Sequence, residues 1–168
     1  MLFRSTHFAC LDLQGANGKI REPGGLGIAS LPTGDTTLLD IDFDLPAEAL
    51  VLKADKPRVA VPVAAACRSI YLLHTINSGT GGDVFVGDMT VEYEDGTHVT
   101  QYVHANQQVE ASLFPLPEVL YGRPTRRGDY HLAWNGQNAE GRDTGLFAYG
   151  WANPHPEKPI KALHFAAA

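Results

Sequence analysis

The stretch that decides the fold is V-E-Y-E-D-G-T-H-V, residues 91–99. Apolar and polar side chains alternate on both sides of its centre, which is the pattern of a strand with one buried and one exposed face. The central dipeptide, Asp95-Gly96, is typical of two-residue hairpin turns in which both residues take positive φ angles. The stretch therefore predicts an antiparallel hairpin with a type I′ turn, and we expect positive φ at Asp95 and Gly96.

The second arm of this hairpin continues the alternation as far as residue 104. Val99 and Val103 fall on the face that Val91 also occupies, so these valines are expected in the core. The opposite face carries His98, Thr100, Tyr102 and His104. We expect this polar and aromatic set to face solvent.

Segments on the N-terminal side of the hairpin also have strand character. Leu39–Asp44 alternates apolar residues with aspartates, which predicts one buried and one solvated face. The expectation is that Leu39, Ile41 and Phe43 are buried and that Asp40 and Asp42 are exposed. Val59–Val63 alternates as well, and its Pro62 favours an edge strand or a strand end. Ile70–Leu73 is an almost continuous apolar run, typical of a central strand covered on both faces.

Three segments on the C-terminal side read as strands: Tyr130–Trp134, Leu146–Trp151 and Ile160–Phe165. Asn135-Gly136 is a second turn signal, and Asn106–Leu113 is the best helical candidate. About ten short strands with scarcely any helix predict an all-β fold, an antiparallel β-sandwich or barrel. The 17 glycines and 11 prolines agree with many turns.

Composition limits the function classes. The 168 residues suit one domain, residues 1–168. The formal charge of -6 disfavours nucleic acid and anionic membranes as partners. No apolar run approaches membrane-spanning length. The N-terminus lacks the apolar region of a signal peptide; an extracellular or periplasmic location is expected only if the chain belongs to a secreted enzyme. Cys10 and Cys67 are interpreted as buried free thiols, with a disulfide between them left open.

Several segments together resemble a known family. They are Phe8–Leu13 followed by Asn17, Ile70–Thr75, Val91–Thr97, Ala133–Gly136, and Trp151–Pro156 followed by Ile160. In order and spacing they resemble the galactose-binding-like jelly-roll domains appended to bacterial glycoside hydrolases and related polysaccharide-degrading enzymes. The resemblance extends over nearly the whole chain. It implies a jelly-roll sandwich and a non-catalytic module, which binds a carbohydrate or packs against a parent catalytic domain, and it raises the prospect of a structural calcium ion.

A sugar site needs an aromatic side chain that stacks on the C–H face of the ring and polar groups that hold the hydroxyls. The residues that offer this chemistry are Tyr102, His104, Asn106, Tyr121, Arg123 and Tyr130. Trp134 and Trp151 lie within apolar strand patterns and are interpreted as core. His74, at the end of an apolar strand, is interpreted as a core histidine, and Asn153–Pro156 as a rigid turn in which the asparagine amide caps the loop.

A calcium site would need carboxylates and carbonyls that converge from loops. The candidates are Asp12, Asn17, Asp83 and Asp88. Two alternatives to the carbohydrate-binding module remain open. One is a structural sandwich that joins domains or forms oligomers, and the other is a small enzyme of unassigned chemistry. The motifs of zinc hydrolases and serine hydrolases are absent from the sequence, so catalysis is the less favoured of the two.

Overall fold

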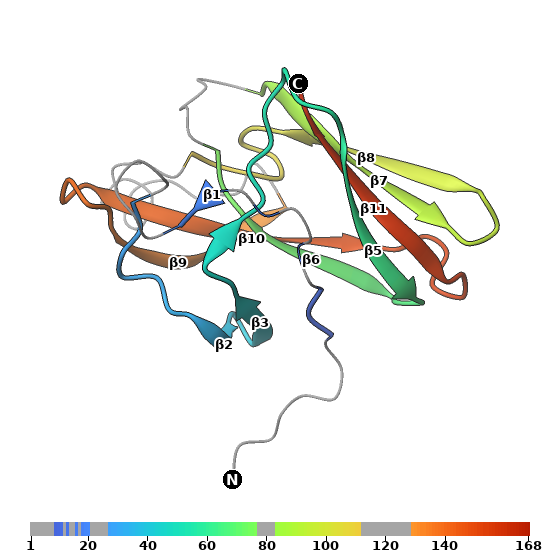
Figure 1. Cartoon of the computed structure of the whole chain (residues 1–168), viewed down its shortest axis with the longest axis horizontal. Coiled ribbons are helices and arrows are strands. Elements are labelled where there is room, and N and C mark those ends of the chain that lie inside the picture. Colours follow the sequence, from blue (N-terminus) through green and yellow to red (C-terminus); the bar gives the residue numbers. More distant parts are fainter. Residues whose placement is uncertain are drawn as a thin grey trace, which may run out of the picture.

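The computed structural model describes residues 9–11, 13, 16, 18–20, 27–76, 83–111 and 129–168. Within these ranges every regular element is a β-strand (Figure 1), so the described chain is all-β, as the sequence predicts. The strands are β1 (Gly18–Lys19), β2 (Gly34–Leu38), β3 (Ile41–Leu45), β4 (Glu48–Ala49), β5 (Val59–Ala65), β6 (Ser69–His74), β7 (Phe85–Tyr93), β8 (His98–His104), β9 (Tyr130–Gln137), β10 (Asp143–Ala152) and β11 (Ile160–Ala167). No described segment forms a helix long and apolar enough to cross a membrane.

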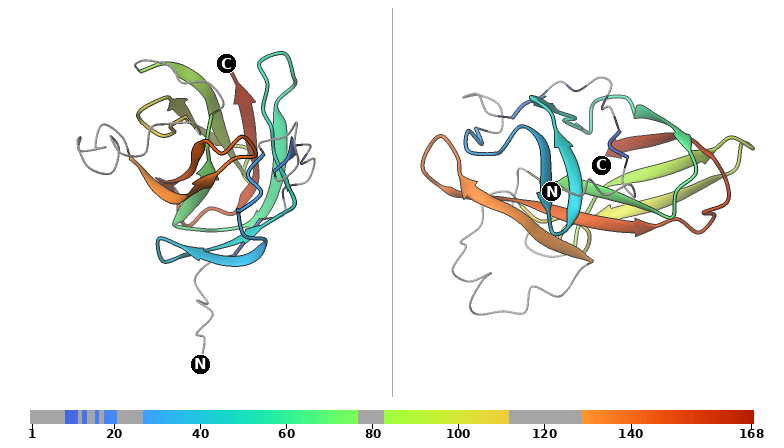
Figure 2. Two further views of the ribbon diagram at one scale, coloured as in Figure 1. Left: turned by 90° about the vertical axis from the view of Figure 1, so that its left-hand side faces the viewer. Right: turned by 90° about the horizontal axis from the view of Figure 1, so that it is seen from below.

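The strands form two larger sheets and two small ones. One larger sheet has the order β5-β11-β7-β8 and the other has the order β6-β10-β9, with antiparallel neighbours throughout. Strand β2 pairs with β3, and β1 pairs with β4. Figures 1 and 2 show that the strands of one larger sheet lie at an angle to those of the other.

The two larger sheets share one hydrophobic core. Its buried members come from five strands of the two sheets: Val61, Ile70, Met89, Val91, Tyr93, Tyr149, Trp151, Ile160 and Leu163. A second cluster of Ile20, Ile28, Leu31, Leu45 and Leu146 lies apart from the first, and the half-buried Trp134 packs against it. Alternation along β7 buries Met89, Val91 and Tyr93, so the residues between them face outward. Trp151 is a core residue, as predicted.

The hairpin of β7 and β8 forms where the sequence predicts it, but its turn differs. Gly96 has a φ of 82°, as expected, whereas Asp95 is not among the residues with positive φ. The Gly96 N–H donates to Tyr93 O at 3.0 Å, and the Tyr93 N–H donates to Thr97 O at 2.9 Å. This is a three-residue loop, a type I turn followed by a glycine in the left-handed region.

The Asp95 side chain explains why this turn is preferred. Its Oδ1 accepts hydrogen bonds from the Thr97 N–H at 2.9 Å and from the Thr97 hydroxyl at 2.6 Å. Lys158 Nζ lies 2.7 Å from Asp95 Oδ2. Bonds from Lys158 and Thr97 hold the pKa of Asp95 well below its ordinary value. The D-G-T sequence therefore specifies a capped turn with one left-handed residue.

Replacing Gly96 with alanine is expected to lower the free energy of unfolding by about 1 kcal/mol, because a Cβ is strained in the left-handed region. A Cβ at this position meets no heavy atom within 4 Å, so no clash adds to the strain. Thermal unfolding should show a midpoint lower by about 2–4 °C. Gly96→Asn is the matched control, since asparagine tolerates this conformation better. An unchanged midpoint in Gly96→Ala would contradict the assigned turn.

A type I′ turn occurs elsewhere, at a place where the sequence predicts a strand. Leu39 and Asp40 have φ angles of 52° and 61°, and Leu38 pairs with Ile41 across them. The prediction that Leu39 is buried is therefore wrong; it is 49% exposed at the tip of the β2–β3 hairpin. Asp42 is half-buried instead of exposed, and its Oδ1 accepts a hydrogen bond from the Thr37 hydroxyl at 2.8 Å.

The sequence predicts the edge position of β5 correctly but not that of β6. Strand β5 pairs with β11 alone among the described strands, so Pro62 lies on an edge strand, as predicted. Strand β6 was expected to be central but has β10 as its single described neighbour, and Tyr71 is 40% exposed. Its apolar run has another cause: Leu72 packs against the main core and Leu73 against the second cluster.

Three smaller expectations need correction. Asn135-Gly136 lies within β9 and not in a turn; the turn follows at Asn138–Arg142. Gly136 leaves room for the Trp134 ring, which would lie 2.6 Å from a Cβ at this position. The described part of the expected helix, residues 106–111, is a loop. Cys10 and Cys67 are free, but Cys10 is exposed and Cys67 is half-buried instead of buried.

Candidate functional site

An exposed aromatic group lies where β7 begins and β8 ends. Tyr102 is 60% exposed and Phe85 is 43% exposed. Their rings meet edge to face with centroids 5.9 Å apart, and the His104 ring lies 5.7 Å from that of Phe85. We call Phe85, Tyr102 and His104 the aromatic platform. Exposed aromatic surface of this kind is a place where a ligand gains contact area at little conformational cost.

Two features of the strands place these rings together. Alternation along β8 sends Tyr102 to the solvent face. The pairing of β7 with β8 is irregular between Phe85 and Gly87, so Phe85 comes opposite His104. Such an irregularity redirects side chains at a strand end. Glycine is required beside it, since a Cβ on Gly87 would lie 2.2 Å from the Ala166 carbonyl oxygen.

Polar groups border the platform on the loop side. His104 Nδ1 lies 2.7 Å from Asp83 Oδ1, and Gln107 Nε2 donates to Asp83 Oδ2. The Asp83 side chain is 54% exposed. The Gln108 side-chain oxygen accepts a bond from the His104 N–H at 2.9 Å. A carboxylate and an amide thus stand beside the rings, already held in place, which lowers the entropy lost when they bind a ligand.

The loop after β8 is anchored to both neighbouring chain segments. The Ala105 N–H donates to Val84 O at 2.8 Å, and the Asp129 N–H donates to Gln107 O at 2.7 Å. His74 Nε2 lies 2.8 Å from Gln108 O. Burial lowers the pKa of His74 to about 4, so the ring is neutral and donates this bond at neutral pH. His74 is thus a half-buried, hydrogen-bonded histidine that lies outside both hydrophobic clusters.

The structure brings together part of the predicted sugar-binding set. Tyr102 and His104 belong to the platform, and Asn106 lies in the loop two residues further on, with a φ of 62°. The Tyr130 hydroxyl donates to Glu110 Oε2 at 2.9 Å, and the Tyr130 ring packs edge-on against Phe147 instead of facing solvent. Burial and the Glu110 carboxylate raise the pKa of Tyr130 well above its ordinary value. Tyr121 and Arg123 lie outside the described residues.

Three residues of the candidate site were missed as sugar-binding candidates: Phe85, Gln107, and Asp83, which the sequence analysis assigns to calcium instead. Phe85 carries no periodic signal, because the irregular pairing that turns it toward His104 cannot be read from the sequence. Gln107 lay within a segment expected to be helical. The one available signal for Phe85 and Gln107 is the run of exposed polar and aromatic residues on β8, since other residues of a binding site would have to lie next to this run.

The calcium candidates do not converge in the described residues. Asp83 bonds His104 and Gln107, whereas Asp88 accepts a two-pronged contact from Arg58. Within the described ranges, no group of three or more histidine, cysteine, aspartate or glutamate side chains is placed to hold a metal ion. Asp12 and Asn17 lie outside those ranges. The calcium site stays a prediction of the sequence.

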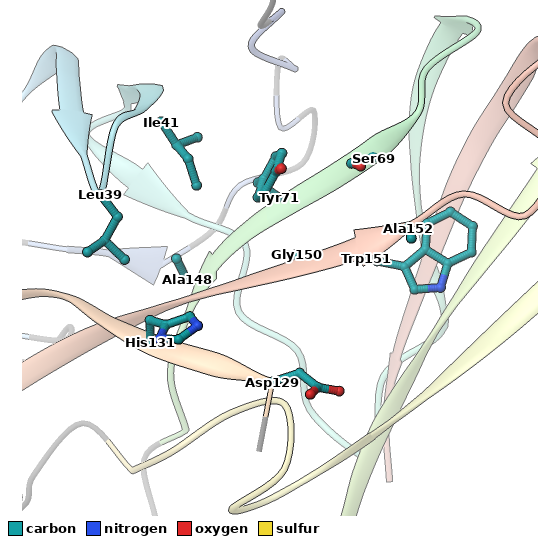
Figure 3. A pocket seen from close by; sticks show the side chains of 10 residues that line it. All are labelled: Leu39, Ile41, Ser69, Tyr71, Asp129, His131, Ala148, Gly150, Trp151 and Ala152. Carbon is teal, nitrogen blue, oxygen red and sulfur yellow. The ribbon is translucent and has the colours of Figure 1, made fainter. Parts of the chain in front are cut away.

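A shallow hollow of about 500 Å³ lies on the three-stranded sheet (Figure 3). Its floor includes the small residues Ala148, Gly150 and Ala152 of β10. The Tyr71 ring packs over Gly150, and its Cε1 lies 3.0 Å from where a Cβ on Gly150 would be. The hairpin tip, residues 39–41, forms one wall (Figure 3). The lining is Leu39, Ile41, Ser69, Tyr71, Asp129, His131, Ala148, Gly150, Trp151 and Ala152. This hollow is a second candidate surface, lined by the exposed rings of Tyr71 and His131.

Comparison with known families, with curated proteins and with solved structures finds no match to this chain. Function therefore has to be inferred from the chain's own residues. The aromatic platform combines exposed rings with a carboxylate and an amide that are bonded to each other, Asp83 and Gln107. Its chemistry is therefore more specific than that of the hollow.

Proposed function

We propose that this chain is a non-catalytic carbohydrate-binding module, and that its two larger sheets form a jelly-roll sandwich of the galactose-binding-like kind. The shared core of these sheets supports the fold proposal. The resemblance in sequence to modules appended to glycoside hydrolases supports a role beside a catalytic domain. The aromatic platform carries the functional proposal.

The platform has the two components that sugar recognition needs. The exposed rings of Tyr102 and Phe85 offer an apolar surface for the C–H face of a pyranose. Asp83 and Gln107 offer a hydroxyl acceptor and an amide beside it. The platform is open to solvent, so each contact competes with water and the gain is modest. We expect dissociation constants on the order of 0.1 to 1 mM for a single sugar.

The proposal predicts that Tyr102→Ala weakens sugar binding about fivefold or more. Loss of a stacking ring costs about 1 kcal/mol or more, which raises a dissociation constant of about 0.1 to 1 mM to about 0.5 to 5 mM or beyond. The assay is affinity electrophoresis through gels that contain neutral polysaccharides, followed by calorimetric titration with soluble fragments.

Tyr71→Ala is the matched control for this experiment. It removes an exposed tyrosine from the other sheet and should leave binding intact, because Tyr71 lines the hollow and not the platform. Binding that is undiminished in Tyr102→Ala and is weakened in Tyr71→Ala would move the site to the hollow. Absence of binding to every polysaccharide tested would favour the structural module instead.

A further inference from the structure

The aromatic platform continues into a polar strip on the outer face of the four-stranded sheet. Tyr102 pairs with Asp88 across β8 and β7, and Thr100 pairs with Thr90. Directly opposed residues in antiparallel strands share one face. Arg58, just before β5, reaches the same place. We call Arg58, Asp88, Thr90 and Thr100 the polar strip.

The strip is a connected hydrogen-bond network. Arg58 donates from Nη2 to Asp88 Oδ2 at 3.0 Å and from Nη1 to Thr90 Oγ1 at 3.0 Å. The hydroxyls of Thr90 and Thr100 are 2.9 Å apart. The Asp88 side chain is 13% exposed and the Arg58 side chain 41% exposed. Asp88 therefore positions the guanidinium, while Arg58 and Thr100 present groups to solvent.

The charges of this face are already paired. Arg58 is held by Asp88 through both terminal nitrogens. Further along β7, Glu92 lies 2.8 Å from Lys161 Nζ and 2.8 Å from His164 Nε2. A carboxylated or sulfated sugar would have to compete with Asp88 for Arg58 or with Glu92 for Lys161, and it would also meet Asp83 at the platform. A neutral sugar needs only hydrogen bonds and meets no such competition.

Resting on the proposed sugar binding, we infer that the site accepts at least two linked neutral sugars, the first stacked on Tyr102 and the second over Arg58 and Thr100. Thr100 is two residues from Tyr102, about 7 Å along the strand. That spacing places the two groups under neighbouring rings of a chain that runs along β8. Because the strip is fixed by its own bonds, the second sugar gains contacts at little ordering cost.

The test is a series of chain lengths. Calorimetric titrations would use glucose, xylose, mannose and galactose, their linear di- and trisaccharides, and galacturonic acid oligomers. The disaccharide of the sugar that binds is expected to bind about tenfold more tightly than the monosaccharide, as two added hydrogen bonds would give. Thr100→Val should reduce that ratio about threefold, and Thr100→Ser, which keeps the hydroxyl, should preserve it.

Thr37→Val is the control, since it removes another exposed threonine hydroxyl, from the β2–β3 hairpin. Melting midpoints would verify that each variant is folded. Equal affinity for mono- and disaccharide, or an unchanged ratio in Thr100→Val, would overturn the extended site and leave the platform intact. Tighter binding of galacturonic acid oligomers would overturn the neutral specificity. Absence of binding by every sugar, at every length, would remove the proposed function itself.

Discussion

Replacing Asn153 with alanine is expected to lower the free energy of unfolding by about 3 kcal/mol. Asn153 is 6% exposed and joins three segments of the fold. Its Oδ1 accepts from the Tyr93 hydroxyl at 2.6 Å and from the His155 N–H at 2.9 Å. Its Nδ2 donates to Cys67 O at 2.9 Å and to His155 O at 3.2 Å. The amide thus links the end of β7, the approach to β6 and its own turn.

The size of the effect follows from what alanine leaves behind. The Tyr93 residue is 0% exposed, so its hydroxyl would have no water to replace the lost acceptor. The Cys67 carbonyl would lose a donor as well. At about 2–4 °C per kcal/mol for a chain of this size, thermal unfolding should show a midpoint lower by about 10 °C. Asn135→Ala, at an exposed strand position, is the matched control and should change stability by less than about 0.5 kcal/mol.

A double-mutant cycle with Tyr93→Phe tests the stated cause. Without the Tyr93 hydroxyl, Asn153→Ala leaves one buried polar group fewer without a partner. The loss in free energy of unfolding should therefore be smaller by about 1 kcal/mol in the Tyr93→Phe background. Denaturant unfolding of the four proteins measures the difference. Equal costs in both backgrounds would show that the Tyr93 bond contributes nothing to the penalty.

Acidification from pH 7 to pH 4 is expected to destabilise the chain through His74, by up to about 3 kcal/mol. Burial lowers the pKa of His74 to about 4 in the folded chain, against an ordinary value of 6.5. The unfolded chain therefore binds the proton first. The stabilising contribution is complete above pH 6.5 and is lost progressively as the pH falls toward 4.

His74→Gln should flatten the pH dependence over this range, because glutamine has an amide donor for Gln108 O and does not titrate. His98→Gln, at an exposed position on β8, is the control and should retain the wild-type slope. The measurement is the free energy of unfolding in urea at several pH values. Identical slopes in wild type and His74→Gln would contradict the assigned role. Since Gln108 also contacts His104, acid should weaken the loop that supports the platform.

The sequence predicts those parts of the fold that depend on local alternation. Strands β7 and β8 appear where apolar and polar residues alternate, β10 is a nearly continuous buried run, and Pro62 marks an edge strand correctly. The turns were less predictable. The Asp95 side chain selects a three-residue loop, and Leu39-Asp40 forms a type I′ turn without the usual glycine or asparagine. Which strand is an edge also depends on pairing between distant segments, so the position of β6 could not be read from its own residues.

In the candidate site too, the sequence predicts what depends on local alternation and misses what depends on contacts between distant segments. Alternation along β8 predicts that Tyr102 and His104 face outward together, and they do. Phe85 reaches them through an irregular pairing, and Asp83 does so through a loop contact more than twenty residues away in sequence. Both depend on tertiary structure. The contact of the Tyr130 hydroxyl with Glu110 is likewise a tertiary contact that strand periodicity does not reveal.

The central claim, that sugar binds at the aromatic platform, is tested most directly by NMR titration of the labelled chain with neutral oligosaccharides. We predict shift changes confined to the neighbourhood of Phe85, Tyr102, His104 and Gln107, and clearly smaller changes in Tyr102→Ala at the same concentrations. Shift changes centred instead on the hollow around Tyr71 and Gly150, or changes that persist undiminished in Tyr102→Ala, would contradict the claim.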